Sequence, residues 1–377
     1  MRIGVDARYA FRTSRRGIGN YVAALVGHLP DACADDEFIL YCDAPAELDA
    51  VGISDPRFRV RQLPVSNPLT FEEWALPRAA REDSLDLLHL TSNYGPSLAP
   101  CPTVYTIHDL IEWIRPTFSQ ARLSFRHGAG RAVRMRTLPR QAARARRIIT
   151  ISTTSRDDLV RILHLSPDRI RIVPLGVSPE LRPHDDPASV RHALRQEGVG
   201  VPDRYVLALG ALDPRKNGPF LIRAFARAQP QLQDVALWVV GVERVGEYPV
   251  PCTPPPPWLT VQGFMERATL IRLLQGATAF AFPSLYEGFG LPVLEAMACG
   301  VPVLASNRSS VPEIAGAAAV LFDPTDEAAL AAHLVRVLND PRGLSELAAA
   351  GRRHVAAFNW GQMARQTYGV YREAVAG

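Results

Sequence analysis

The sequence predicts an α/β protein of two doubly wound domains, each a parallel sheet covered by helices on both faces. Three observations support this fold class. Short β-branched runs alternate with helical stretches in the first half, the alternation returns in the second half, and a polar, Pro-containing stretch at 178–188 lies between them. The 377 residues, 47% hydrophobic and 21% charged, are enough for two cores. We expect the first domain at 1–180 and the second at 181–358.

The first half contains six strand-like runs and two helix-like stretches. The strands are short and rich in Val, Ile and Leu, which is typical of strands buried on both faces. Strands are predicted at 2–7, 38–42, 85–90, 103–109, 146–152 and 169–177, and helices at 20–29 and 121–146.

The second half repeats this pattern. Strands are predicted at 204–210, 235–241, 259–264, 278–282, 301–305 and 319–322, and helices at 218–229, 266–275, 292–299, 326–339 and 343–357. The Pro-rich stretch 250–258 excludes a helix and predicts a rigid surface loop. Two such domains joined by a linker predict a ligand cleft between them, at the carboxyl ends of the strands.

Composition excludes several functional classes. The net charge of +4 is too small to indicate a nucleic-acid partner. The cysteines form an odd, scattered set without a Cys-x-x-Cys pair, which indicates reduced thiols and a cytoplasmic protein. The first residues contain no signal-peptide core, and no uncharged apolar run reaches the ~20 residues that a membrane span requires. The five cysteines are Cys33, Cys42, Cys101, Cys252 and Cys299.

The first candidate motif is SLYEGFGLPVLEAMACG, residues 284–300, which follows a predicted strand. Gly288 and Gly290 allow close approach of a ligand to the backbone, and Pro292 fits the start of the next helix. The free amides of that helix are suited to a phosphate, and Glu287 and Glu295 can accept hydrogen bonds from paired sugar hydroxyls. We expect Glu295 in the first helical turn. The alternative is a Gly-Pro turn with two solvated glutamates.

The second motif is GALDPRKNG, residues 210–218, directly after another strand. Arg215 and Lys216 are adjacent cations at the carboxyl end of that strand, just before a predicted helix. Two fixed positive charges match a diphosphate, with the Arg forking onto oxygens and the Lys acting as a point charge. The alternative is a solvated surface loop, but proximity to the glutamate pair favours the phosphate site.

The third motif is YTIHDL, residues 105–110, where His108 and Asp109 end a predicted strand of the first domain. A histidine there can donate to a sugar hydroxyl or steady a leaving phosphate. A structural histidine is the alternative.

The fourth motif is RRGIGNY, residues 15–21, predicted as a loop between the first strand and the first helix. The residues Gly17, Ile18 and Gly19 superficially match a dinucleotide fingerprint, but Val22 stands where the third glycine belongs. We therefore expect a loop whose amides reach a phosphate or an acceptor, and an NAD-dependent oxidoreductase is disfavoured.

Together these motifs resemble those of a known family. The segment PSLYEGFGLPVLEAMACGVPVLASNRSSVPEIAG, with GALDPRKN, is similar to the retaining GT-B glycosyltransferases of family 4, in particular the mannosyltransferase-B-like group of bacterial surface-polysaccharide enzymes. Looser matches are RIGVDAR, GIGNY, IVPLGV and FNWGQMARQTYGVYREA. The resemblance implies two Rossmann-like domains facing across a cleft, with the last helix, 359–377, packing back on the first domain. The Pro-rich stretch 250–258 departs from the family pattern.

The resemblance also implies roles for individual residues. Glu295 would hold the nucleotide ribose and Glu287 the donor sugar, while Arg215 and Lys216 would neutralise the diphosphate. The remaining contacts would be His108 and Asp109 beside the transferred sugar, Gly17, Ile18 and Gly19 near the phosphates or acceptor, and Asn217, Gly288, Phe289, Gly290 and Leu291 around the donor.

The function implied is retaining transfer of a hexose from a nucleotide sugar to a hydroxyl of a glycan or lipid-linked saccharide. GDP-mannose is the donor that the resemblance favours, and UDP-glucose, UDP-galactose and dTDP-rhamnose stay open. No cofactor or metal is implied, since helix amides and the two cations supply positive charge and no Asp-x-Asp motif occurs. The alternatives are a nucleotide-sugar epimerase of similar shape and a non-catalytic sugar-nucleotide-binding subunit.

An Arg-rich segment, 122–147, predicts contact with an anionic membrane surface on the inner face of the plasma membrane. The alternative is a solvated helix whose arginines pair with nearby acids, and Pro139 weakens the amphipathic pattern. The arginines are Arg122, Arg126, Arg131, Arg134, Arg136, Arg140, Arg144, Arg146 and Arg147, interleaved with Leu123, Phe125, Val133, Met135 and Leu138.

Overall fold

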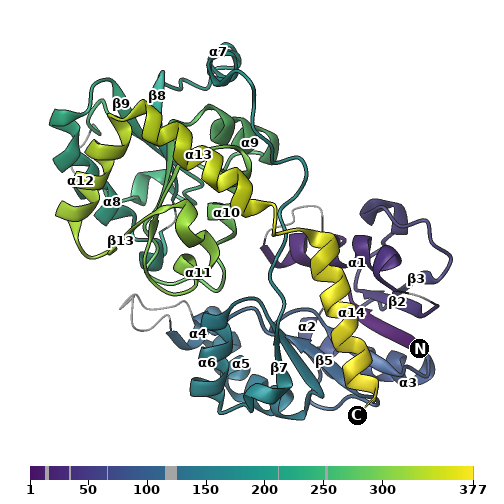
Figure 1. The fold of residues 1–377 in the computed structure, drawn as a ribbon. Helices are drawn as coiled ribbons and strands as arrows, with labels where there is room; N and C mark the ends of the chain where they lie inside the picture. Colours follow the sequence, from purple (N-terminus) through teal and green to yellow (C-terminus); the bar gives the residue numbers. More distant parts are fainter. Residues whose placement is uncertain are drawn as a thin grey trace. The chain divides into compact units, whose positions relative to one another are not determined.

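The chain forms two compact units in the computed structural model (Figure 1). The structure describes residues 1–12, 17–33, 35–65, 67–114, 125–210, 212–250 and 254–376, with the side chains of 125–134 left out. Unit 1 comprises Met1–Ile114, Ala121–Gly176 and Phe358–Gly377, and unit 2 contains Val177–Ala357. The divisions therefore fall after Gly176 and after Ala357, beside the expected divisions after residues 180 and 358.

Unit 1 is built on a parallel sheet of seven strands in the order β3-β2-β1-β4-β5-β6-β7. The strands are β1 (Arg2–Asp6), β2 (Glu37–Cys42), β3 (Phe58–Gln62), β4 (Leu87–Leu90), β5 (Thr103–Thr106), β6 (Arg147–Thr150) and β7 (Ile170–Ile172). The strand order reverses between β1 and β4, as in doubly wound nucleotide-binding folds. Strand β3 was not predicted from the sequence; its residues FRVRQ include two arginines that suit its place at the sheet edge.

Helices cover both faces of this sheet. They are α1 (Gly17–Ala32), α2 (Pro68–Thr70), the π-helical turn η2 (Phe71–Ala75), α3 (Leu76–Glu82), α4 (Ile111–Ile114), α5 (Phe125–Arg144), α6 (Thr153–Leu163) and α14 (Trp360–Ala376). Phe71 and Leu76 share one core with Leu138 of α5 and Leu159 of α6. The last helix, α14, packs beside α1 in unit 1 (Figure 1).

Two expectations for unit 1 are wrong in detail. Strand β5 ends at Thr106, so His108 and Asp109 lie in the loop after it. Helix α1 begins at Gly17, so Gly17, Ile18 and Gly19 form its first turn and are not part of a loop. Glycine weakens a helix interior, but at the first turn it costs little because the following residues carry the helix.

Unit 2 repeats the architecture with a six-stranded parallel sheet in the order β10-β9-β8-β11-β12-β13. The strands are β8 (Arg204–Leu209), β9 (Val235–Val240), β10 (Leu259–Val261), β11 (Ala279–Phe282), β12 (Val303–Ser306) and β13 (Val320–Phe322). The helices are α7 (Pro187–Gln196), α8 (Gly218–Ala228), α9 (Arg267–Gly276), α10 (Leu291–Ala298), α11 (Val311–Ala315), α12 (Glu327–Leu338) and α13 (Pro341–Val355). The fold class predicted from the sequence, two Rossmann-like parallel-sheet domains, is confirmed.

The Pro-rich stretch lies partly outside the described residues, since 251–253 are not described. Its last residue, Trp258, is partly buried and packs on Phe225 of α8, with ring centroids 5.5 Å apart. Among the helices of the described residues, none is both long and apolar enough to cross a membrane.

Candidate functional site

Two loops of unit 2 leave the sheet where its strand order reverses, between β8 and β11. The loop after β8 contains the short 3₁₀ turn Pro214–Lys216 and leads into α8, and the loop after β11 leads into α10. In open parallel sheets this reversal point is the usual ligand position. The residues predicted to bind the donor therefore share one sheet edge.

The loop before α10 is held in a conformation that requires glycine. Gly290 is the N-cap of α10 with φ of 106°, a region that other residues avoid. The Ser310 hydroxyl donates to the Phe289 carbonyl at 2.8 Å, and the Ser309 hydroxyl donates to the Glu287 carbonyl at 2.6 Å. In the first turn of α10, Pro292 has no N–H and the Val293 amide donates to the Gly290 carbonyl at 2.9 Å.

Glu287, Arg215 and Lys216 form one partly buried ion cluster. Lys216 Nζ lies 2.6 Å from Glu287 Oε1, and Arg215 Nη1 lies 3.1 Å from Glu287 Oε2. Burial alone would raise the pKa of Glu287, but the charges of Lys216 and Arg215 outweigh it and hold that pKa below its ordinary value. The carboxylate is therefore ionised at neutral pH, and the loops after β8 and β11 are joined through it.

Arg215 also has a structural role. It is almost fully buried, and its Nη1 donates to the Tyr286 carbonyl at 2.7 Å. Lys216 is more accessible, with 22% of its side chain exposed. Of the two cations, Lys216 is therefore better placed to change partner when an anion arrives.

Asn217 joins two loops of the same unit. Its φ is 57°, in the left-handed region, and its amide donates to the carbonyls of Pro283 and Pro324 at 3.3 and 2.8 Å. Asparagine tolerates this backbone better than most residues. The side chain predicted to bind substrate is thus engaged by carbonyl groups.

Glu295 pairs with Arg267, a cation that was not predicted from the sequence. Arg267 Nη1 donates to Glu295 Oε1 at 3.2 Å, while Arg267 Nε donates to Glu180 at 2.6 Å. Burial raises the pKa of Glu295, and the Arg267 charge offsets only part of this effect. Glu295 is the fifth residue of α10, so the expected place in the first turn is wrong. The only sequence signal for Arg267 is its place at the start of the helix after β10.

His108 and Asp109 lie in unit 1. His108 is buried, its Nε2 bonds to the Thr91 carbonyl at 3.1 Å, and its ring meets Tyr21 edge-on at 4.8 Å between centroids. Burial lowers the pKa of His108 to about 4, so the imidazole is neutral at pH 7. Asp109 Oδ1 accepts from the Ile111 amide at 3.0 Å at the start of α4.

A chain of buried hydrogen bonds runs from the last helix to Tyr21, whose ring contacts His108. Tyr371 of α14 bonds to His89 Nδ1 at 2.7 Å, His89 Nε2 to Thr106 at 2.8 Å, and Thr106 to Tyr21 at 3.0 Å. Burial lowers the pKa of His89 to about 3. Polar residues inside the apolar strands were the only sequence signal for this chain.

Gly17, Ile18 and Gly19 open α1, which carries Tyr21. Gly17 is exposed, and a Cβ added there would meet no atom within 4 Å, whereas Gly19 is buried. The residue beside His108 is therefore Tyr21 of helix α1, where a loop was expected.

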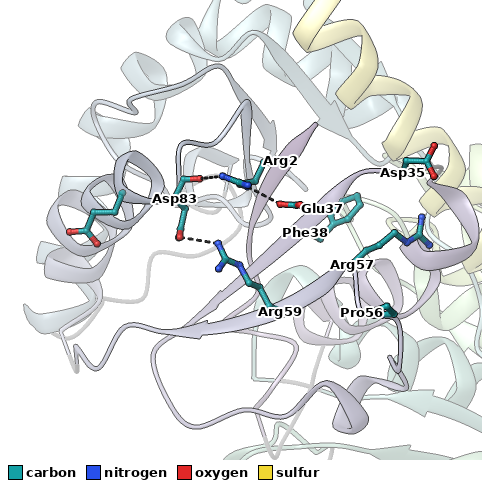
Figure 2. Close-up of a pocket in the computed structure, with 9 residues that line it drawn as sticks. Arg2, Asp35, Glu37, Phe38, Pro56, Arg57, Arg59 and Asp83 are labelled. Carbon is teal, nitrogen blue, oxygen red and sulfur yellow. Dashed lines mark hydrogen bonds and ion pairs between the residues drawn. The ribbon is translucent and has the colours of Figure 1, made fainter.

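A hollow lies elsewhere in unit 1, at the amino ends of β1, β2 and β3 (Figure 2). Its volume is about 670 Å³, and it is lined by Arg2, Asp35, Glu37, Phe38, Pro56, Arg57, Arg59, Glu82 and Asp83. Charged side chains of this hollow form ion pairs with one another: Arg2 pairs with Glu37 at 2.9 Å and Arg59 with Asp83 at 3.0 Å. With its cations paired and at the edge opposite the strand ends that bind ligands, this hollow is not the candidate site.

Two family models match the chain. The model for Glycosyltransferase Family 4 matches residues 15–181, and the model for Glycosyl transferases group 1 matches residues 191–354. The chain is 31% identical over 246 residues to O-antigen chain mannosyltransferase B of Escherichia coli. This match covers 60% of the chain and 61% of that relative, less than two thirds of its length.

Solved structures share the fold over the whole chain. Sucrose-phosphate synthase from Thermosynechococcus elongatus matches with a TM-score of 0.73 and 22% identity, covering 100% of this chain and 99% of that one. Anabaena Alr3699/HepE in complex with UDP-glucose matches with a TM-score of 0.70 and 18% identity, covering 99% of both. At these identities the likeness shows the fold alone.

Proposed function

Because the chain belongs to the GT-B glycosyltransferases of family 4, we propose that it transfers a hexose from a nucleotide sugar to an acceptor hydroxyl, with retention of configuration. The observation that carries this proposal is the cluster of Glu287, Arg215 and Lys216 at the strand-order reversal of unit 2. It combines a fixed carboxylate for sugar hydroxyls with cations for a diphosphate.

We assign the donor to the start of α10. The amides of Phe289, Gly290 and Leu291 receive it there, and Glu295 accepts from the ribose hydroxyls. When the donor binds, the hydrogen bond from Lys216 Nζ to Glu287 weakens and the ammonium group contacts the diphosphate. The negative charge of the diphosphate grows as the glycosidic bond breaks. Glu287 then keeps Arg215 as its partner and accepts from a hydroxyl of the hexose.

His108 and Asp109 are assigned to the region of the transferred sugar. With Nε2 held by the Thr91 carbonyl, the imidazole carries its hydrogen there and presents Nδ1 as an acceptor. A neutral ring of this kind can accept from a sugar hydroxyl at pH 7 but is a poor acid. In this mechanism no protein nucleophile acts, and the leaving phosphate helps remove the proton of the attacking hydroxyl.

For the donor we propose GDP-mannose, because the relative in Escherichia coli is named a mannosyltransferase. UDP-glucose is the second candidate, because the HepE structure is a complex with that nucleotide sugar. The acceptor we propose is a glycan or a lipid-linked saccharide. The helix amides with Arg215 and Lys216 supply the positive charge, so activity in excess EDTA should equal that in its absence.

Thermal unfolding of the full chain in the presence of GDP, UDP, dTDP and their sugars tests the donor. A matching nucleotide at 100 times its Kd should stabilise the fold by about 2.7 kcal/mol. Lys216→Ala should lose most of this gain, whereas Arg223→Gln, an exposed arginine of the same unit, should keep it. The absence of any shift with every nucleotide would contradict the proposal.

A product assay separates the alternatives. An epimerase would convert the donor sugar without an acceptor, and a binding subunit would bind the donor without turning it over. The proposed transferase should consume donor only when an acceptor sugar is present, and NMR of the product should show the donor's anomeric configuration.

A further inference from the structure

Unit 1 exposes two large apolar side chains, Trp74 of η2 and Leu98 of the loop before β5, whose neighbours in sequence are joined by hydrogen bonds. Trp74 and Leu98 are 76% and 69% exposed. The carboxylate of Glu73 accepts from both the amide and the hydroxyl of Ser97 at 2.9 Å, which ties the neighbours of Trp74 and Leu98 together. Leu69, 53% exposed, lies about one turn before Trp74. We call Leu69, Trp74 and Leu98 the Trp74 patch.

This patch lies on the solvent side of elements whose other side is buried. Phe71, Leu76, Leu138 and Ala142 of η2, α3 and α5 are in the core. The side chains of the Trp74 patch therefore do not contribute to the core of the unit. An exposed tryptophan with two exposed leucines indicates a binding surface. Leu138 is 1% exposed, so its expected place at a membrane interface is wrong.

A stripe of arginines borders the patch. Arg136, Arg140 and Arg144 are exposed and lie four residues apart on α5, so they share one face of the helix. Arg144 donates to the Ser97 carbonyl at 2.6 Å, which joins the stripe to the loop that carries Leu98. The other arginines of the segment up to Arg134 lie outside the described side chains.

These three arginines lack carboxylate partners in the part of the chain that the structure describes. Among the described residues, some exposed arginines are paired, as Arg78 is with Glu82 and Arg308 with Asp323, whereas others, such as Arg353 and Arg365, have no carboxylate within ion-pair distance. The expectation that arginines of this segment pair with acids holds for Arg147, which contacts Glu373 at 3.4 Å, and fails for the stripe.

We propose that the Trp74 patch and the arginine stripe together bind the surface of an anionic phospholipid bilayer. The indole and the leucines enter the interface, where an amphipathic ring is favoured, and the arginines meet lipid phosphates. A second copy of the chain fits less well, because a symmetric contact through this face would bring one basic stripe against the other. The proposal does not rest on the proposed transfer reaction.

Vesicle co-sedimentation of the full chain tests the proposal without any substrate. Vesicles of phosphatidylcholine with phosphatidylglycerol should bind the chain at least tenfold more strongly than pure phosphatidylcholine at low salt, and high salt should remove most of this difference. The triple variant R136Q/R140Q/R144Q should lose about fivefold in affinity per arginine. The variant W74S/L98S should lose about tenfold or more.

Matched variants serve as controls. Val245→Ser changes another exposed apolar residue and Arg353→Gln another exposed arginine, and both should bind vesicles like the wild type. Because all changed residues are exposed, thermal unfolding should be the same for every variant.

Three results would overturn the proposal. The first is equal binding to neutral and anionic vesicles, and the second is unchanged binding by W74S/L98S. The third comes from sedimentation velocity: if wild type dimerises and W74S/L98S is monomeric with unchanged vesicle binding, the patch joins two copies of the chain.

Discussion

The side chains of Glu287 and Glu295 are only 13% and 12% exposed, yet their surroundings move their pKa values in opposite directions. Burial acts on both, but Lys216 and Arg215 lower the pKa of Glu287 below its ordinary value, whereas Arg267 leaves the pKa of Glu295 raised. A lowered pKa stabilises the fold above the ordinary pKa, and this contribution is lost as pH falls through the lowered value. A raised pKa stabilises the fold at acid pH, and that contribution is lost as pH rises through the raised value.

The two Gln variants should therefore differ in stability. Glu287→Gln should lower the free energy of unfolding at pH 7 by about 1–3 kcal/mol, with a smaller difference from wild type at pH 4. Glu295→Gln should unfold at or above the wild-type temperature at pH 8, because Arg267 keeps Glu180 as a partner at 2.6 Å. Denaturant unfolding across pH measures both.

The same Glu295→Gln variant should bind nucleotide about tenfold more weakly, because an amide is a poorer acceptor for ribose hydroxyls than a carboxylate. Calorimetric titration with the nucleotide found by thermal unfolding measures the loss. A folded variant with wild-type affinity would remove Glu295 from the site.

Lys216 should matter for turnover more than for stability. Its side chain is partly exposed and its one carboxylate partner, Glu287, keeps Arg215 when Lys216 is removed. Lys216→Ala should therefore lower kcat by about 10²–10³-fold, since a charge that acts on the leaving diphosphate is lost. Steady-state kinetics at saturating donor, with Arg223→Gln as control, gives the answer. Near-wild-type kcat would contradict the assignment.

For single residues, the sequence could predict which ones lie at the same sheet edge but not which side chains they contact. Arg215, Lys216 and Glu287 follow neighbouring central strands, and parallel strand ends meet at one edge, so their proximity was predictable. The contact between Arg267 and Glu295 joins the start of α9 to α10 across 28 residues of sequence, and no local pattern predicts it.

Among the elements, α10 depends on the backbone of Gly290. Its φ of 106° is strained for any residue with a side chain, although the nearest atom to an added Cβ is Val311 Cγ2 at 3.8 Å. Gly290→Ala should therefore destabilise the fold by about 1–2 kcal/mol through the backbone alone. It should also weaken donor binding, because the amides of Phe289 and Leu291 shift.

Gly200→Ala is the matched control, since that glycine has open space and an ordinary φ. Thermal unfolding and nucleotide titration of both variants make the comparison. If Gly290→Ala matched Gly200→Ala in both measurements, the loop before α10 would not require its left-handed residue.

Prediction of elements succeeded where burial is greatest. The six strands of unit 2 were predicted to within three residues at each end, because a strand buried on both faces is a continuous apolar run. Edge strand β3 and several helices, among them α3, α6, α7 and α11, were not predicted. The arginines of β3 mask its pattern, and α7 begins at Pro187 inside the stretch predicted as linker.

For the whole molecule, two similar sheets differ in what they bury. Unit 1 buries His89 and His108 in strands and loops of its sheet, while the ion cluster of unit 2 has no histidine. The repeated β/α alternation made two domains predictable. The chain of hydrogen bonds from Tyr371 was not, because His89 and Tyr371 are 282 residues apart in sequence.

This difference predicts that acid destabilises unit 1 before unit 2. The pKa values of His89 and His108 are lowered to about 3 and about 4, so both are neutral in the fold, whereas the unfolded chain binds protons below pH ~6.5. Stability due to neutral histidines is present above that pH and is lost as pH falls. Between pH 6.5 and 5 the two should lower the free energy of unfolding of unit 1 by about 2–4 kcal/mol.

Hydrogen exchange of the ligand-free chain at pH 7 and pH 5, corrected for intrinsic rates, measures each unit separately. Amides of β4 and β5 should lose protection at pH 5, while those of β8 and β11 should change less, because the ion cluster beside these strands has no histidine and the pKa of Glu287 lies below its ordinary value. His108→Asn should remove about half of the loss, since one of the two buried neutral imidazoles is gone. Equal loss of protection in both sheets would mean that acid acts on the chain as a whole, and the buried histidines would not be the cause.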